Sequence, residues 1–318
     1  HVARGVFNAG IPMDAGLYTL VDSLIYSFHM PLFFLLSGYF FIESTLRRGA
    51  INQSINKFNT IFYVFIIWSI LHGLVEVGLS QFTTNQLSLS ELTDLSNHPR
   101  NHFWFLFALF VISFISAYIY AFAGKKWHVL VLVVGAFLYI ARDNIDNFTA
   151  IDYFFMGSAV FFMFGVSLSI WLKSGRTPTL LFVAILGILT VFAQWYYHIE
   201  MAWTWDDAPA WARMLLAILT IYFVVSLCQR CAHWMPGVFA YLGKHSLEIY
   251  LMHLIAGSGI RIVLQKFAGI ESVPVHLAVG TLLGIVLPLI GMYMINVLRM
   301  RFLFEPPFFL RIPYINKP

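Results

Sequence analysis

The segment SFHMPLFFLLSGYFF, residues 27–41, places a histidine inside a long apolar stretch. Inserting an ionisable residue into a membrane-spanning helix costs about 2.5 to 3.5 kcal/mol, so such a residue usually faces a protein interior or a wet cavity. A helix would place Asp22 on the same face as His29, with Ser37 beside them. Pro31 would kink this helix, because proline cannot donate a backbone hydrogen bond to the preceding turn. The pattern indicates either a substrate cavity or interhelical hydrogen bonds.

Two other apolar stretches carry polar side chains at helical spacing. His72 and Glu76 stand four residues apart, so a helix would bring them onto one face, either to orient a substrate hydroxyl or to form a structural pair. Tyr250, His253 and Arg261 belong to a second polar stripe, which would run along a single helix through the membrane. Such a stripe is equally typical of a cavity lining and of interhelical hydrogen bonding.

Three further features of the sequence bear on its chemistry. Trp104 stands at the end of an apolar stretch, where tryptophan is typical of an interfacial anchor and also suits a substrate contact. Cys228, Cys231 and His233 offer three zinc ligands, but no second cysteine pair completes a structural site. We therefore predict no metal site. The absence of a glycine-rich nucleotide loop also disfavours an ATP-driven pump.

The composition requires membrane helices to position these side chains. Of the 318 residues, 60% are hydrophobic and 11% are charged, and the mean hydropathy is +0.79. An ordinary water-soluble domain is far more polar. The aromatic content of 18% fits helices with interfacial aromatic belts better than the alternating strands of an outer-membrane barrel. We therefore predict an all-α integral membrane protein. The scattered basic residues and the modest net charge of +4 argue against nucleic-acid binding.

Nine apolar runs are suited to crossing a hydrocarbon core of about 30 Å. They are residues 17–42, 59–80, 103–123, 127–141, 151–172, 179–197, 210–230, 246–265 and 276–298. No linker rich in proline, glycine or serine separates them, so we predict one polytopic helical bundle over residues 1–318.

The charged residues predict the orientation, because cytoplasmic loops carry an excess of lysine and arginine. Arg47 and Arg48 lie among basic residues on one side, whereas Asp206 and Asp207 lie among acidic residues on the other. This pattern places the carboxyl terminus in the cytoplasm and His1 outside. An odd number of spans then predicts a tenth helix upstream, so we expect the chain to be truncated at its amino terminus.

Three landmarks together resemble the membrane-bound acyltransferase 3 family. They are FHMPLFFLLSGYFF at 28–41, NHFWFLFALF at 101–110 and LGKHSLEIYLMHL at 242–254, in the order that the family shows. Within the family the chain is most similar to the branch of fucose 4-O-acetylase-like sugar O-acetyltransferases. The resemblance implies ten core helices, and transfer of an acyl group, usually acetyl from acetyl-CoA, to a hydroxyl of an extracytoplasmic or lipid-linked glycan.

The resemblance also implies a catalytic residue. The family signature is an arginine followed eleven positions later by a histidine, and His1 matches that histidine. A neutral imidazole with a pKa near 6.5 can accept the proton of a sugar hydroxyl, which contributes about 10² to 10⁴ in rate. We therefore expect His1 to act as the general base. Histidine can also act as a nucleophile, so both direct transfer and an acyl-histidine intermediate stay open.

The partners follow from the same resemblance. Acetyl-CoA or another acyl-CoA would be a co-substrate, with no permanently bound cofactor, and the acceptor would be a glycan or a lipid-linked sugar. The location would be a bacterial inner membrane. The alternative is a non-enzymatic transporter or flippase of glycans or small solutes, in which polar intramembrane residues are equally expected. Inverted repeats and discontinuous helices would favour that alternative.

Overall fold

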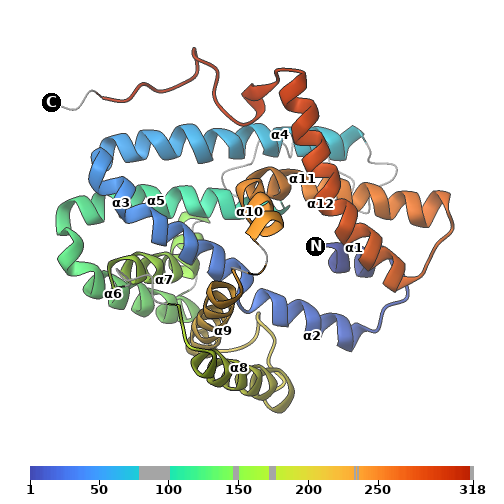
Figure 1. Ribbon diagram of the computed structural model, residues 1–318, viewed down its shortest axis with the longest axis horizontal. Helices are drawn as coiled ribbons and strands as arrows, with labels where there is room; N and C mark the ends of the chain where they lie inside the picture. The colour runs from blue at the N-terminus through green and yellow to red at the C-terminus, as the bar shows by residue number, and fades with distance from the viewer. Residues whose placement is uncertain (79–100, 146–149, 172–176, 233, 235, 316–318) are drawn as a thin grey trace. The chain divides into compact units, whose positions relative to one another are not determined.

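The computed structural model describes residues 1–78, 101–145, 150–171, 177–232, 234 and 236–315. Within these ranges every regular element is a helix and there is no strand, as Figure 1 shows. Eight helical segments in the described part are long and apolar enough to cross a membrane. The predicted all-α polytopic membrane bundle is therefore confirmed. Residues 79–80 and 172, at the ends of two predicted spans, and His233 lie outside the described residues.

The described helices range from short ones to helices that are long enough to cross a membrane. They are α1 Val2–Asn8, α2 Ala15–Tyr26, α3 His29–Lys57, α4 Tyr63–Gly78, α5 Trp104–Ala123, α6 His128–Ala141, α7 Ala150–Trp171, α8 Leu180–Trp195, α9 Ala210–Cys231, α10 Pro236–Lys244, α11 Ser246–Ile262 and α12 Val273–Val297. Short π-helical turns follow α3, α8 and α11. Helices α1 and α10, of 7 and 9 residues, were not predicted, because they are too short to give a membrane-length apolar run.

The first predicted span, residues 17–42, is interrupted. Helix α2 ends at Tyr26 and α3 begins at His29. Pro31 therefore lies in the first turn of α3, where a backbone N–H has no intrahelical acceptor, and does not kink one continuous helix. A break thus separates Asp22 from His29, and the single helix face that we expected them to share does not exist.

A second break divides the two N-terminal spans. The helical run Ala15–Gly78 has 64 residues, far more than one crossing requires. Within α3, Gly49 has a φ of +77°, a backbone conformation that glycine adopts at little cost. The predicted spans 17–42 and 59–80 lie on either side of this residue.

The described residues divide into two compact units. The first contains the described residues of 1–23, 70–78 and 231–303, which include α1, α10, α11 and α12. The second contains the described residues of 24–69, 101–230 and 304–315, which include α3 and α5 to α9.

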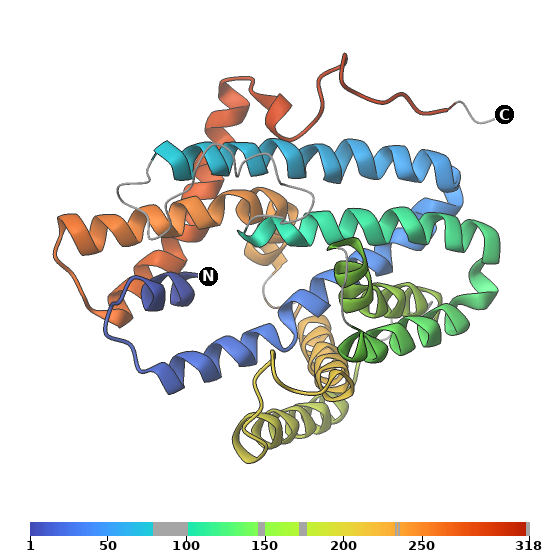
Figure 2. The ribbon, with the colours of Figure 1, turned by 180° about the vertical axis from the view of Figure 1, so that it is seen from behind.

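Close contact between α3 and α7 organises the second unit (Figure 2). A Cβ atom on Gly38 would collide with the carbonyl oxygen of Phe162, and a Cβ atom on Gly165 would collide with the carbonyl oxygen of Leu35. Small residues allow membrane helices to approach in this way. Next to this crossing, the ring of Phe41 packs edge-on against Phe162, with centroids 5.0 Å apart.

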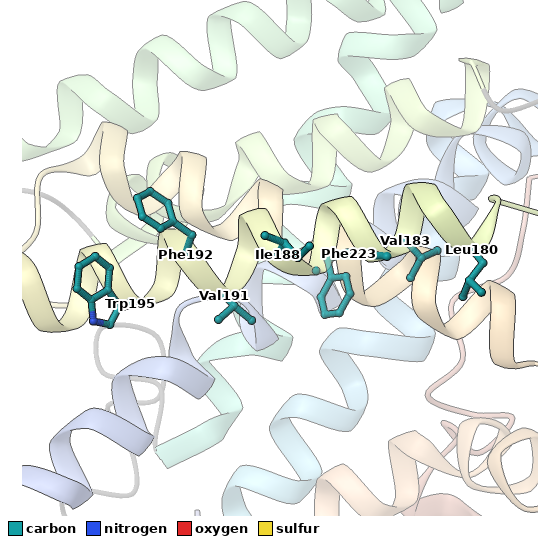
Figure 3. Close-up of a pocket in the computed structure, with 9 residues that line it drawn as sticks. Leu180, Val183, Ile188, Val191, Phe192, Trp195 and Phe223 are labelled. Atoms are coloured by element: carbon teal, nitrogen blue, oxygen red, sulfur yellow. The ribbon is translucent and has the colours of Figure 1, made fainter.

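An apolar groove runs along α8 in the same unit (Figure 3). Its lining residues are Leu180, Val183, Ala184, Gly187, Ile188, Val191, Phe192 and Trp195 of α8, with Phe223 of α9. Ile188 is 70% exposed and Val191 is 69% exposed. Because α8 is a candidate membrane span, the hydrocarbon chains of the bilayer would cover this apolar face. The face would then expose no apolar surface to water.

Candidate active site

The packing of Val2 positions α1 in the first unit. Helix α1 contacts both α11 and α12. A Cβ atom on Gly280 of α12 would lie 2.8 Å from Val2 Cγ1, and a Cβ atom on Gly257 of α11 would lie 3.7 Å from Val2 Cγ2. The two glycines thus leave the space that the valine side chain fills. Because His1 directly precedes Val2 and is the N-cap of α1, the same packing positions His1.

A bidentate ion pair connects α1 to α2. Arg4 Nε donates to Asp22 Oδ1 and Arg4 Nη2 donates to Asp22 Oδ2, each at 2.7 Å. The rings of Phe7 and Tyr18 stack beside this pair, with centroids 4.1 Å apart. Asp22, which we expected to line a cavity, therefore binds the residue three positions after His1, where it helps to hold α1.

The imidazole rings of His1 and His253 lie next to each other. Their centroids are 5.0 Å apart, with an angle of 52° between the ring planes. His253 Nδ1 lies 2.7 Å from the Tyr250 carbonyl oxygen and 3.2 Å from the Ile249 carbonyl oxygen. Both neighbours are acceptors, so Nδ1 carries the proton, and neutral His253 has its acceptor nitrogen at Nε2.

The contacts of two further predicted residues of the first unit are defined, those of His72 and Arg261. His72 is 3% exposed, and its Nε2 lies 2.8 Å from the Leu251 carbonyl oxygen, which links the end of α4 to α11. Glu76 follows one turn later on α4. Arg261 lies two turns after His253 on α11, and its Nε is buried without a hydrogen-bond partner among the described residues.

Arg261 also approaches α1. Its Cδ and Nε atoms would each lie 3.8 Å from a Cβ atom on Gly5. The first unit thus presents a histidine pair and an arginine with a buried Nε beside one short helix. Seven of the predicted site residues belong to this unit: His1, Asp22, His72, Glu76, Tyr250, His253 and Arg261.

The other three predicted site residues, His29, Ser37 and Trp104, belong to the second unit. His29 Nδ1 lies 2.8 Å from the Ile25 carbonyl oxygen. Trp104 stacks on Phe154, with ring centroids 5.8 Å apart. Both contacts are with neighbouring protein groups, and a role for His29, Ser37 and Trp104 in binding substrate stays a prediction.

An ion pair between a buried arginine and a partly exposed aspartate in the second unit was missed in the sequence. Both oxygens of Asp143 accept hydrogen bonds from Arg213 Nη2, at 2.7 and 2.8 Å. Asp143 Oδ2 also accepts the Ala210 N–H at the start of α9, at 2.9 Å. The signal was present, because an arginine inside the predicted span 210–230 requires an internal partner.

The described residues contain no group of three or more histidine, cysteine, aspartate or glutamate side chains that could hold a metal ion. Cys228 and Cys231 are free thiols.

The comparisons with known proteins identify the family. Neither the curated proteins nor the solved structures give a match to this chain. A family model of the acyltransferase 3 group, described as an acyltransferase domain, matches residues 1–296. The match includes every residue of the candidate site and favours an acyltransferase over a transporter. The chain therefore belongs to the acyltransferase 3 family of membrane proteins.

Proposed function

We propose that this membrane acyltransferase transfers an acetyl group from acetyl-CoA to a hydroxyl of a glycan or lipid-linked sugar, with His1 as the general base. The observation that carries the proposal is the position of the His1 ring, 5.0 Å from that of His253. Family membership supports the acyl-transfer chemistry, and a histidine is the side chain best suited to activate a hydroxyl at neutral pH.

In the proposed reaction the acceptor oxygen attacks the thioester carbon while the His1 imidazole takes the hydroxyl proton. The new carbon–oxygen bond replaces the carbon–sulfur bond, and the proton then passes to the departing CoA sulfur. His253 would act as a positioning residue. With its Nδ1 proton donated to the Tyr250 carbonyl, His253 Nε2 can accept a hydrogen bond from the imidazole of His1.

Arg261 would supply positive charge to the same reaction. Its buried, unpartnered Nε supports a role in binding an anion, because burying a polar donor without a partner is costly. The guanidinium could stabilise the oxyanion that develops during attack, or bind a phosphate of CoA. The positive-inside pattern supports entry of the donor from the cytoplasm, and places the acceptor on the opposite side of a bacterial inner membrane.

The test is acetyl transfer by the full-length protein in proteoliposomes, measured with labelled acetyl-CoA and a panel of oligosaccharides. His1→Ala should lower turnover by about 10² or more, the usual contribution of a general base. His245→Gln is the matched control, because this residue lies in the same unit at the N-cap of α11. Thermal unfolding of each variant checks folding. Unchanged turnover in folded His1→Ala protein would disprove the assignment.

A further inference from the structure

The C-terminal segment 312–315 is bound by asparagine side chains in the second unit. Asn59 Nδ2 donates to the Ile312 carbonyl oxygen at 2.9 Å, and Asn59 Oδ1 accepts the Ile312 N–H at 3.1 Å. Asn52 forms the same two hydrogen bonds with Ile315, at 3.0 and 2.9 Å. Each asparagine therefore binds both the donor and the acceptor of one residue's main chain.

The spacing of these asparagines matches an extended chain. Asn52 and Asn59 are seven residues apart, which corresponds to about 10.5 Å along a helix. The two residues that they bind are three positions apart, which corresponds to about 10 Å of extended chain. Asn56 lies between them on the same face, and its Oδ1 accepts the Tyr314 hydroxyl at 3.0 Å. We call Asn52, Asn56 and Asn59 the asparagine ladder.

The asparagine ladder contacts mainly the backbone of the segment. Four of its five hydrogen bonds to the segment involve main-chain groups. The bound residues Ile312 and Ile315 are 37% and 57% exposed, so burial of their side chains contributes little to recognition. Pro313, which has no N–H, falls between the two bound positions, where the ladder needs no donor. The geometry therefore selects an extended backbone and discriminates weakly between side chains.

The ladder needs a partner, and the chain just before the segment is exposed. Asn59 is 4% exposed, and a buried amide without hydrogen bonds is unfavourable. The chain that precedes the segment contains Phe304, whose ring lies 5.7 Å from that of Trp68, and then Phe308, which is 95% exposed. It also lies beyond residue 296, where the family match ends, while the ladder lies within the match.

We propose that the asparagine ladder is a binding site for an extended polypeptide, filled by the chain's own C-terminal segment in an exchangeable way. The ligand class is a peptide in extended conformation with free N–H and C=O groups three residues apart. A tethered segment competes with an external peptide at an effective concentration in about the millimolar range. Release of the C-terminal segment would therefore expose the site to the same peptide added in trans.

The test measures binding of a labelled synthetic peptide of residues 307–318 to the full-length protein by fluorescence anisotropy. In the Ile315→Pro variant the tethered segment loses one N–H donor, while the ladder is unchanged. The peptide should bind this variant at least about fivefold more tightly than the unaltered protein, because removing one hydrogen bond weakens the competitor by about that factor. Equal binding to the two proteins would overturn the proposal.

Modified peptides test whether the backbone is the ligand, without altering the protein. Methylation of the Ile312 or the Ile315 amide nitrogen should abolish binding, because each methyl group removes a donor to the ladder. Methylation of the Tyr314 nitrogen is the matched control, because its N–H takes no part in the ladder. If the peptides methylated at either isoleucine bind as tightly as the unmodified one, the proposal is wrong.

A substitution in the asparagine ladder itself gives an independent test. Asn52→Leu in the Ile315→Pro protein removes the partner of Ile315 and should lower peptide affinity at least about fivefold. Asn52 is more exposed than Asn59, so this substitution is the gentler of the two for folding. Unchanged affinity in the folded double variant would show that the peptide binds elsewhere and would refute the proposal.

Discussion

The ring of His1 lies 5.0 Å from the ring of His253, and the residues that follow His1 hold it there. Val2 fills the space above Gly280, and Arg4 forms an ion pair with Asp22. Neither of these two contacts involves the imidazole itself. The proposed base is therefore positioned by groups that need not touch substrate, which makes its placement testable by substitutions outside the reaction centre.

The contact between Gly280 and Val2 gives the first prediction. In Gly280→Ala the new Cβ would lie 2.8 Å from Val2 Cγ1, so α1 must move. A displacement of about 1 Å at a reacting group can cost about 10²-fold in rate, so we expect turnover to fall at least tenfold. The measurement is acetyl transfer in proteoliposomes.

Gly284→Ala is the control for this prediction, because the added methyl group on the next turn of α12 meets no atom within 4 Å. Its turnover should equal that of the unaltered protein. Adding Val2→Ala to Gly280→Ala removes the colliding methyl groups and should restore much of the lost turnover. Failure of this rescue would argue against steric displacement of α1.

The ion pair of Arg4 with Asp22 gives the second prediction. The two side chains are 37% and 23% exposed, so Asp22→Asn should lower the free energy of unfolding by less than about 1 kcal/mol. Turnover should fall more steeply, because α1 loses its anchor to α2. Arg4→Lys keeps the charge but not the two parallel hydrogen bonds, and should show the same pattern in milder form. Losses of stability and turnover in equal proportion would indicate a purely structural pair.

The membrane fold was predictable because apolar run length and charge distribution are properties of sequence alone. The break between Tyr26 and His29 was not, because apolar residues continue through it without a change in composition. Pro31 was a correct signal of a helix boundary, but proline is compatible both with a kink and with the first turn of a new helix.

The candidate site was only partly predictable for a different reason. Polar residues inside apolar runs identified His253 and Arg261, but the contact of His253 with His1 joins residues 252 positions apart and depends on tertiary packing. The asparagine ladder was missed because its partners are 253 and 263 positions away. Nothing local distinguishes asparagines that bind a chain from asparagines on a polar face.

The crossing of α3 and α7 gives the third prediction. Gly38→Ala or Gly165→Ala would drive a methyl group into a backbone carbonyl, which cannot move aside like a flexible side chain. We expect each variant to lose about 2 to 3 kcal/mol of unfolding free energy, measured by denaturation in mixed micelles. Gly78→Ala is the control, because its added Cβ meets no atom of the described residues within 4 Å, and it should change stability by less than about 1 kcal/mol. Equal stability in all three variants would contradict the close approach.

The ion pair of Asp143 with the buried Arg213 gives the last prediction. Arg213 is 7% exposed and Asp143 is 35% exposed, so Asp143→Asn would leave a buried guanidinium without its countercharge. Because solvent screens the partly exposed carboxylate, the expected cost is about 2 kcal/mol of unfolding free energy. The exposed pair of Lys125 and Glu43 is the matched control, and Glu43→Gln should cost less than about 1 kcal/mol. Replacing both members of this pair, as Asp143→Asn with Arg213→Gln, removes the unpaired charge and should restore part of the loss. Strictly additive losses in that double variant would mean that the two residues do not stabilise the protein as a pair.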